Sequence, residues 1–173
     1  MFRILTLLCL ALPLIFSGCA SPEGPATRLL KANVLPLDLN ESYQFRKILK
    51  TTLDPEVKQT QTKNEPVLFE RARLTWGAID SIEYSKCSGN YFTFFWRNTT
   101  RSDVTLRLEY RQAGLGNYVM AQERYYPDTI GSHRSTFEVT GDDFLEAGLV
   151  TSWRALLIVN GRIVAFKQSF MWK

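Results

Sequence analysis

The sequence has few of the residues that build catalytic and metal sites. It contains one histidine and three cysteines in 173 residues. It has no nucleophile–histidine–acid set, no zinc-ligand spacing and no paired acid–base carboxylates, so we expect neither an enzyme nor a bound cofactor. An excess of charge of one sign is lacking too, because 21 basic and 17 acidic residues leave a formal net charge of +4. That balance indicates no nucleic-acid partner.

Long hydrophobic runs are missing except at the N-terminus. Arg3 precedes an apolar stretch from Ile4 to Phe16, and the small residues Ser17 and Gly18 follow it. A helix of this length spans roughly 20 Å, which is less than the roughly 30 Å hydrocarbon core of a bilayer. The stretch is therefore not expected to remain as a transmembrane helix. The layout is typical of a cleaved secretory signal over residues 1–18.

The four residues Phe16-Ser17-Gly18-Cys19 resemble the lipobox of bacterial lipoproteins, in which a cysteine directly follows the cleavage point. Phe16 departs from the leucine that the family favours at that position. The resemblance implies a diacylglyceryl thioether on Cys19 and several acyl chains, which hold such proteins on a membrane. In this family an aspartate after the cysteine retains the protein in the inner membrane, so Ala20 implies the outer membrane, facing the periplasm. The alternative is plain secretion with cleavage after Ala20, because Gly18-Cys19-Ala20 also fits a small-x-small site.

The cysteines permit no internal disulfide in the mature chain. Cys9 lies in the signal, and lipidation of Cys19 leaves Cys87 as the only free thiol. A reactive pair of Cys87 with the single histidine, His133, is one interpretation. We favour the other, in which both residues are incidental, because nothing in the sequence brings them together.

Residues 19–66 are rich in proline and poor in aromatic side chains. Five of the seven prolines lie within residues 20–66, whereas this stretch holds two of the 22 aromatic residues. Such a composition predicts a semi-extended, lipid-anchored tether with a domain boundary near Pro66.

One part of this tether has the spacing of a helix. Asn40 is a suitable N-cap, and Pro55 would end the helix. Apolar residues between them recur at i, i+3, i+4 and i+8, which predicts a short helix over residues 41–53. This helix would either pack on the domain or serve as a docking helix for a partner.

Residues 67–173 hold 18 of the 22 aromatic residues and predict strands separated by turns. Alternating apolar residues over Val104–Tyr110 are typical of a strand with one buried face, and Asn160-Gly161 favours a type I′ hairpin turn. Without long helices between them, these strands predict an all-β fold, an antiparallel β-sandwich. We expect about seven strands, at Glu70–Trp76, Tyr91–Asn98, Val104–Arg111, Tyr118–Tyr126, Arg134–Val139, Val150–Val159 and Arg162–Trp172.

The number and spacing of these strands resemble immunoglobulin-like and fibronectin type III-like modules over residues 67–173. The Cys…Trp…Cys pattern of disulfide-bearing immunoglobulin domains is absent. A sandwich behind a lipobox is also similar to small periplasmic lipoproteins of unknown function. The first resemblance implies an architecture, and the second implies a location.

Three carboxylates gather in one short segment, at Asp142, Asp143 and Glu146. Carboxylate oxygens are the ligands that calcium prefers, which makes these residues weak candidates for a metal site, but their spacing does not match an EF-hand loop. We favour a one-turn helix between two strands, with an aspartate at its N-terminus and Gly148 at its end.

The aromatic residues suggest a sugar-binding platform as a second candidate site. Large aromatic side chains within strands usually fill the core, and we expect core packing for the tryptophans. The pair Tyr125-Tyr126 with Pro127, at a strand end, is the expected contact surface. The platform would draw on Trp76, Trp96, Trp153 and Trp172, together with Tyr125 and Tyr126.

A third candidate is the outward face of the strand that contains Arg107 and Arg111. Guanidinium groups on this face would meet phosphate groups of lipid or polysaccharide. Glu109 and Glu123 are available for cross-strand pairing, however, and such surface pairs are ordinary. We therefore expect a solvated face of mixed charge.

Together these features predict a lipoprotein of the bacterial cell envelope, attached to a membrane through Cys19, that works without catalysis. The first expectation is a protein-interaction or structural module that contacts an envelope protein through a strand edge or through Tyr125–Pro127. The alternative is a carbohydrate- or small-ligand-binding module.

Overall fold

The computed structural model describes residues 24–54 and 63–172. Within these ranges the chain forms six strands, three α-helices and one 3₁₀ turn. All strands pair antiparallel in one sheet, in the order β1–β4–β3–β5–β6, and β2 pairs with β3 as well. The expected all-β, antiparallel, sandwich-like fold is confirmed. The expected signal over residues 1–18 and Cys19 lie outside the described residues.

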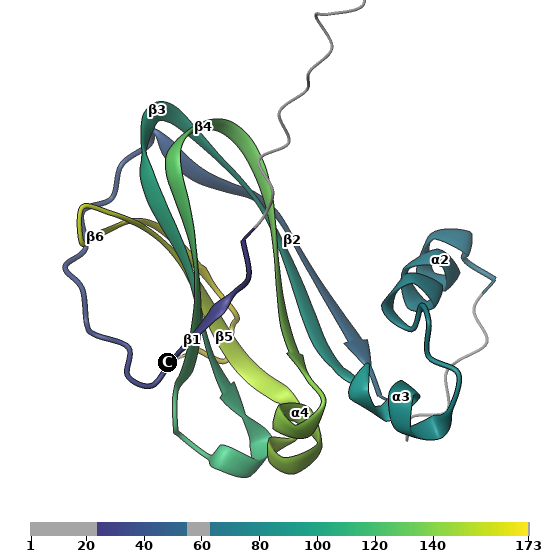
Figure 1. The fold of residues 1–173 in the computed structure, drawn as a ribbon. Coiled ribbons are helices and arrows are strands. Elements are labelled where there is room, and N and C mark those ends of the chain that lie inside the picture. The colour runs from purple at the N-terminus through teal and green to yellow at the C-terminus, as the bar shows by residue number, and fades with distance from the viewer. Residues whose placement is uncertain (1–23, 55–62, 173) are drawn as a thin grey trace, which may run out of the picture.

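A long hairpin of two strands organises the fold. β3 (Gly89–Gln112) and β4 (Met120–Thr140) are joined through η1 (Ala113–Leu115). Pairing between the two strands shifts register between Asn98 and Val104. Irregularities of this kind bend strands and increase their twist, and Figure 1 shows both strands turning over at this point. Each half of the hairpin therefore lies in a different layer.

The remaining strands pair with one half of the hairpin or the other. β2 (Tyr43–Leu53) pairs with the first half of β3 and completes the first layer. β5 (Val150–Val159) pairs with the second half of β3, and β6 (Arg162–Gln168) pairs with β5. β1 (Thr27–Leu29) adds a short edge to β4 in this second layer.

The core fills the space between the two layers. Alternate residues of β3 on either side of its bend point into it, and each is at most 1% exposed. Trp153 of β5 connects the layers, because its ring centroid lies 6.0 Å from that of Phe92 and 5.9 Å from that of Phe94. The inward residues of β3 include Phe92, Phe94, Trp96, Val104, Leu106, Leu108 and Tyr110.

The expected helix over residues 41–53 is wrong, because these residues form β2. A register shift between Phe45 and Lys47 explains the misleading spacing. One extra residue at that point lets Phe45 and Ile48, three positions apart, both pack against the core. The bulge thereby imitates the i, i+3 spacing of a helix. The expected tether is corrected as well, since β1 and β2 belong to the sheet.

The expected strand over Glu70–Trp76 is also wrong. The segment lies in and after α2 (Glu65–Leu74), which α3 (Ser81–Lys86) follows. The Asp80 side chain accepts a hydrogen bond from the Glu83 backbone N–H at 2.8 Å and so caps α3. Figure 1 shows both helices set apart from the sheet. Trp76, expected in the core, is 89% exposed. The described residues therefore contain six strands, and two of them precede residue 67.

Two local predictions are confirmed. The segment with three carboxylates forms α4 (Asp142–Ala147) between β4 and β5, and Gly148 ends it with a φ of 74°. Asn160 and Gly161 join β5 and β6 with φ values of 50° and 72°, as a type I′ turn requires. In the part of the chain that the structure describes, no helix is long and apolar enough to span a membrane.

Candidate functional site

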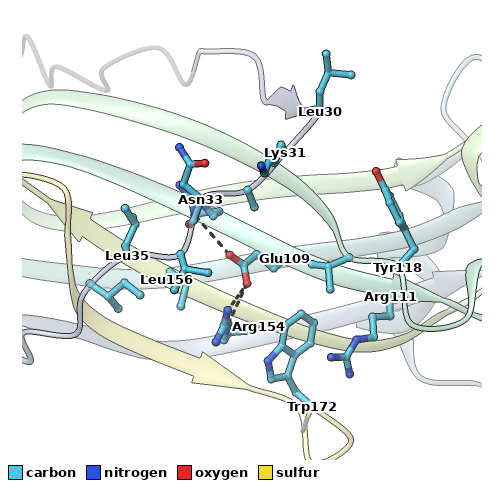
Figure 2. Close-up of a pocket in the computed structure, with 15 residues that line it drawn as sticks. Leu30, Lys31, Asn33, Leu35, Glu109, Arg111, Tyr118, Arg154, Leu156 and Trp172 are labelled. Atoms are coloured by element: carbon cyan, nitrogen blue, oxygen red, sulfur yellow. Dashed lines mark hydrogen bonds and ion pairs between the residues drawn. The ribbon is translucent and has the colours of Figure 1, made fainter.

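The outer face of the second layer contains a groove with a volume of about 550 Å³. Arg107, Glu109 and Arg111 alternate with the core residues of β3 and so point to this face. Arg154 of β5 lies directly opposite Glu109 in the strand pairing. Figure 2 shows Glu109 near the centre of the groove, between Arg154 and the segment that contains Asn33.

The segment of residues 30–35, which we call the strap, covers part of this face. Asn33 accepts a hydrogen bond from Nη1 of Arg107 at 2.9 Å through its backbone carbonyl. Leu35 packs against a small apolar cluster of Leu156, Ile158 and Ile163. Beyond the strap, the backbone N–H of Asp38 donates to the carbonyl of Ile163 at 2.9 Å. The strap is therefore held at its C-terminal end by β6.

Beneath the strap lies a network of four charged side chains. Glu109 accepts from Arg154 at 2.5 and 3.0 Å and lies 3.5 Å from Nη1 of Arg107. Nε of Arg107 donates to Glu123 at 2.6 Å. The side chains of Arg107 and Glu109 are only 8% and 5% exposed. Charges removed from water in this way are tolerated when they are paired, as they are here.

Trp172 forms the floor at one end of the groove. Its ring lies between two guanidinium groups, with 4.6 Å from its centroid to Arg111 and 5.1 Å to Arg154. Each contact has cation–π geometry. The Trp172 side chain is buried and therefore offers no exposed face for a sugar.

Positive charge predominates in the groove. Lys31, Arg107, Arg111 and Arg154 line it against a single acidic residue, Glu109. Glu123, which lies outside the lining, pairs with Arg107. The ion pairs formed among the described residues do not include Lys31, which is exposed at the rim.

The expectation of a solvated face of mixed charge is therefore corrected. Glu123 does form a cross-strand pair, with Arg107, but Arg107 and Glu109 are buried. Their cover comes from the strap and from Trp172, which lie more than sixty positions away from them in the sequence. No pattern within β3 indicates that cover.

The three residues of the predicted contact surface, Tyr125–Pro127, do not all face the solvent. Tyr125 is 59% exposed, and Pro127 is exposed beside it. Tyr126 turns inward, where its hydroxyl lies 2.5 Å from that of Ser135 and its ring packs edge-on against Trp96. A hydrogen bond to Asp103 raises the pKa of Tyr125, and the backbone N–H of Asp128 and the Tyr125 hydroxyl lower the pKa of Asp103. Only Tyr125 and Pro127 are therefore available for contact.

The three weak metal candidates, Asp142, Asp143 and Glu146, lie on α4. Asp143 accepts two hydrogen bonds from Arg28 at 2.7 and 2.9 Å, which uses its carboxylate in an ion pair between α4 and β1. Among the described residues, no group of three or more histidine, cysteine or acidic side chains is placed to hold a metal ion.

Cys87 and His133 are engaged with different neighbours. The Cys87 carbonyl accepts a hydrogen bond from Tyr91, whose pKa burial raises to about 12. His133 stacks on Trp96, with 4.3 Å between the ring centroids, and lies 3.1 Å from the Asn98 side-chain oxygen. Burial lowers the pKa of His133.

Comparisons with models of protein families, with curated proteins and with solved structures gave no match to this chain. Its candidate function is therefore argued from the groove itself.

Proposed function

We propose that this protein is a non-catalytic binding module of the bacterial cell envelope and that the groove takes a small anionic ligand. The observation that carries the proposal is a partly covered groove of about 550 Å³ whose lining holds four basic side chains and one acidic side chain. Ligand sites are commonly concave, in the range of about 300–1,000 Å³, with apolar walls and a few fixed polar groups. Trp172 and the strap supply such walls, and the arginines supply the polar groups.

Lys31 is the residue that we assign to the ligand's charge, because it is exposed at the rim of the groove and the ion pairs formed among the described residues do not include it. Arg107 and Arg154 contact Glu109 or Glu123. A carboxylate or phosphate beside Lys31 would accept a charge-assisted hydrogen bond, which is the stronger kind.

Neutralising Lys31 is expected to weaken anion binding. Lys31→Gln should raise the Kd for hexanoate by about tenfold or more, because it removes a charge-assisted hydrogen bond. The measurement is calorimetric titration of the mature chain carrying Cys19→Ser, which lacks the lipid and retains every described element.

Arg101→Gln is the matched control for this titration. Arg101 is 62% exposed and pairs with Asp128 at 2.8 Å, away from the groove. Unchanged binding in Lys31→Gln, or an equal loss in Arg101→Gln, would contradict the assignment of the site.

We further propose anchoring through lipid on Cys19, in the outer membrane and facing the periplasm. The support is the resemblance of residues 16–19 to a lipobox and the presence of Ala20 rather than aspartate after the cysteine. Cys19→Ala is expected to move the protein from the membrane fraction to the soluble fraction, because several acyl chains are lost together. If the variant stays with the membrane fraction as the parent does, the anchor is not at this residue.

An envelope protein is a second candidate partner, at a different surface. Tyr125 and Pro127 are both exposed where β4 turns between the layers. Tyrosine is among the residues that contribute most to protein interfaces. Tyr125→Ala is the variant that would abolish such a contact without touching the groove.

A further inference from the structure

We infer that the outer face of the first layer docks on a membrane surface that carries anionic lipid head groups. The inference rests on the anchor proposed at Cys19 and adds to it an orientation of the folded domain. Two observations carry it. One is a cluster of cations on this face, and the other is the place where the described chain begins.

The cations lie on three neighbouring strands, close to the bend between the layers. Phe95 and Arg97 alternate with the core residues of β3 and so face outward. Lys47 of β2 and Arg134 of β4 are paired with Phe95 from its two sides. The Arg134 guanidinium lies 6.0 Å from the centroid of the Phe95 ring. We call these four residues the basic face.

The three cations of the basic face are exposed, and none of them belongs to an ion pair formed among the described residues. Within the described strands of this layer, Glu138 is the one acid. It is paired with Tyr91, four residues along β3 from Phe95, which corresponds to roughly 13 Å. That separation exceeds the Debye length of about 8 Å at physiological ionic strength. The cations are therefore available to negative head groups.

The described chain begins beside the same layer. The carbonyl of Gly24 accepts a hydrogen bond from Nη1 of Arg124, and Nε of Arg124 donates to the carbonyl of Thr136 at 2.9 Å. Thr136 lies on β4, two residues from Arg134 of the basic face. Gly24 is five residues from Cys19, so the two are at most about 18 Å apart, even in an extended chain. A lipid on Cys19 therefore holds this part of the first layer near the membrane.

Charge complementarity and proximity together select a lipid surface as the occupant. Each basic side chain next to a negative bilayer strengthens binding by roughly fivefold. A few such side chains add to an anchor that is already present. The acyl chains would retain the protein, and the basic face would determine which side of the domain meets the bilayer. Because the groove lies on the outer face of the second layer, it would then open away from the membrane.

Vesicle sedimentation tests this face in the absence of the lipid anchor. The mature chain carrying Cys19→Ser is mixed with vesicles of phosphatidylcholine, or of phosphatidylcholine and phosphatidylglycerol in equal parts. It should sediment with the mixed vesicles and stay in solution with the neutral ones. Sodium chloride at about 1 M, where the Debye length is about 3 Å, should release it.

Lys47→Gln combined with Arg134→Gln should weaken binding to the mixed vesicles by about twentyfold, because two basic contacts are lost. The matched control is Lys86→Gln combined with Lys167→Gln, which removes the same amount of charge. Lys86 and Lys167 are exposed on α3 and on β6, away from the basic face. The control pair should weaken binding by less than about threefold, because charges beyond a Debye length are largely screened.

Binding that does not depend on phosphatidylglycerol, or an equal loss in both double variants, would overturn the inference. Binding to polyglutamate without binding to the mixed vesicles would also overturn it, because the face would then fit an acidic protein. The anchor is tested separately by fractionating Cys19→Ala after a wash in high salt, which removes the contribution of the basic face. Failure of the anchor and failure of the basic face are therefore distinguishable.

Discussion

Phe94→Ala is expected to lower the free energy of unfolding by about 3–5 kcal/mol, the usual cost of removing a buried aromatic ring. Phe94 is fully buried on β3 and its ring contacts those of Phe45, Phe137 and Trp153, at centroid distances of 6.0, 5.9 and 5.9 Å. These neighbours come from β2, β4 and β5, so the cavity would open at the centre of both layers. Urea denaturation followed by tryptophan fluorescence measures the change.

Phe69→Ala is the matched control for this variant. Phe69 lies on α2 and is 69% exposed, so its removal should change the free energy of unfolding by less than about 0.5 kcal/mol. A small effect of Phe94→Ala would mean that the two layers do not pack around the inner face of β3. The described architecture would then be wrong at its centre.

Glu109→Gln is expected to cost about 3–5 kcal/mol of folding stability. The substitution keeps the shape of the side chain and removes its charge, leaving Arg107 and Arg154 without their shared partner. The Arg107 side chain is only 8% exposed, so its charge cannot return to water without displacing the strap. Arg107 keeps Glu123 as a partner, but the network then holds two guanidinium groups against one carboxylate, and an uncompensated buried charge is costly.

Glu123→Gln provides the comparison for the Glu109 variant. Glu123 is 24% exposed and bonds only to Arg107 in this network, so its replacement should cost about 1 kcal/mol. Chemical denaturation of both variants gives the ratio of the two effects. Equal costs would contradict the view that Glu109 is the centre of the network.

The sequence alone was sufficient for the parts of the fold that depend on local patterns. Alternation along residues 104–110 indicated the inner and outer faces of β3 correctly, and Asn160-Gly161 located the last hairpin. Both signals arise from neighbours a few residues apart. The hairpin and the strand faces therefore needed no knowledge of the rest of the chain.

Other features depended on contacts that local patterns do not encode. The bulge after Phe45 gave β2 the spacing of a helix, and only the pairing partner, β3, reveals the extra residue. The segment before it looked like a tether because it is rich in proline. Proline at a sheet edge is compatible with sheet structure, however, and Pro36 accepts a hydrogen bond from Ile163 of β6.

The groove was the least predictable feature. Arg107, Glu109 and Arg111 were recognised as one face, but the residues that cover and extend that face come from the strap and from the C-terminus. A strap that is itself poor in aromatic residues gives no sign of what it covers. The charged residues of the site could thus be predicted from the sequence of one strand, but their burial could not.

The central claim, an anion site in the groove, is tested most directly by following the indole N–H signals of the four tryptophans during titration with hexanoate. Trp172 lies against Arg111, whereas Trp96 is buried and donates to Ser135 at 2.9 Å inside the core. Two-dimensional ¹H–¹⁵N spectra should show a saturable shift of the Trp172 signal, assigned through Trp172→Phe, with the Trp96 signal unmoved. A Trp172 signal that stays fixed at saturating hexanoate, or equal shifts of all the indole signals, would contradict the account.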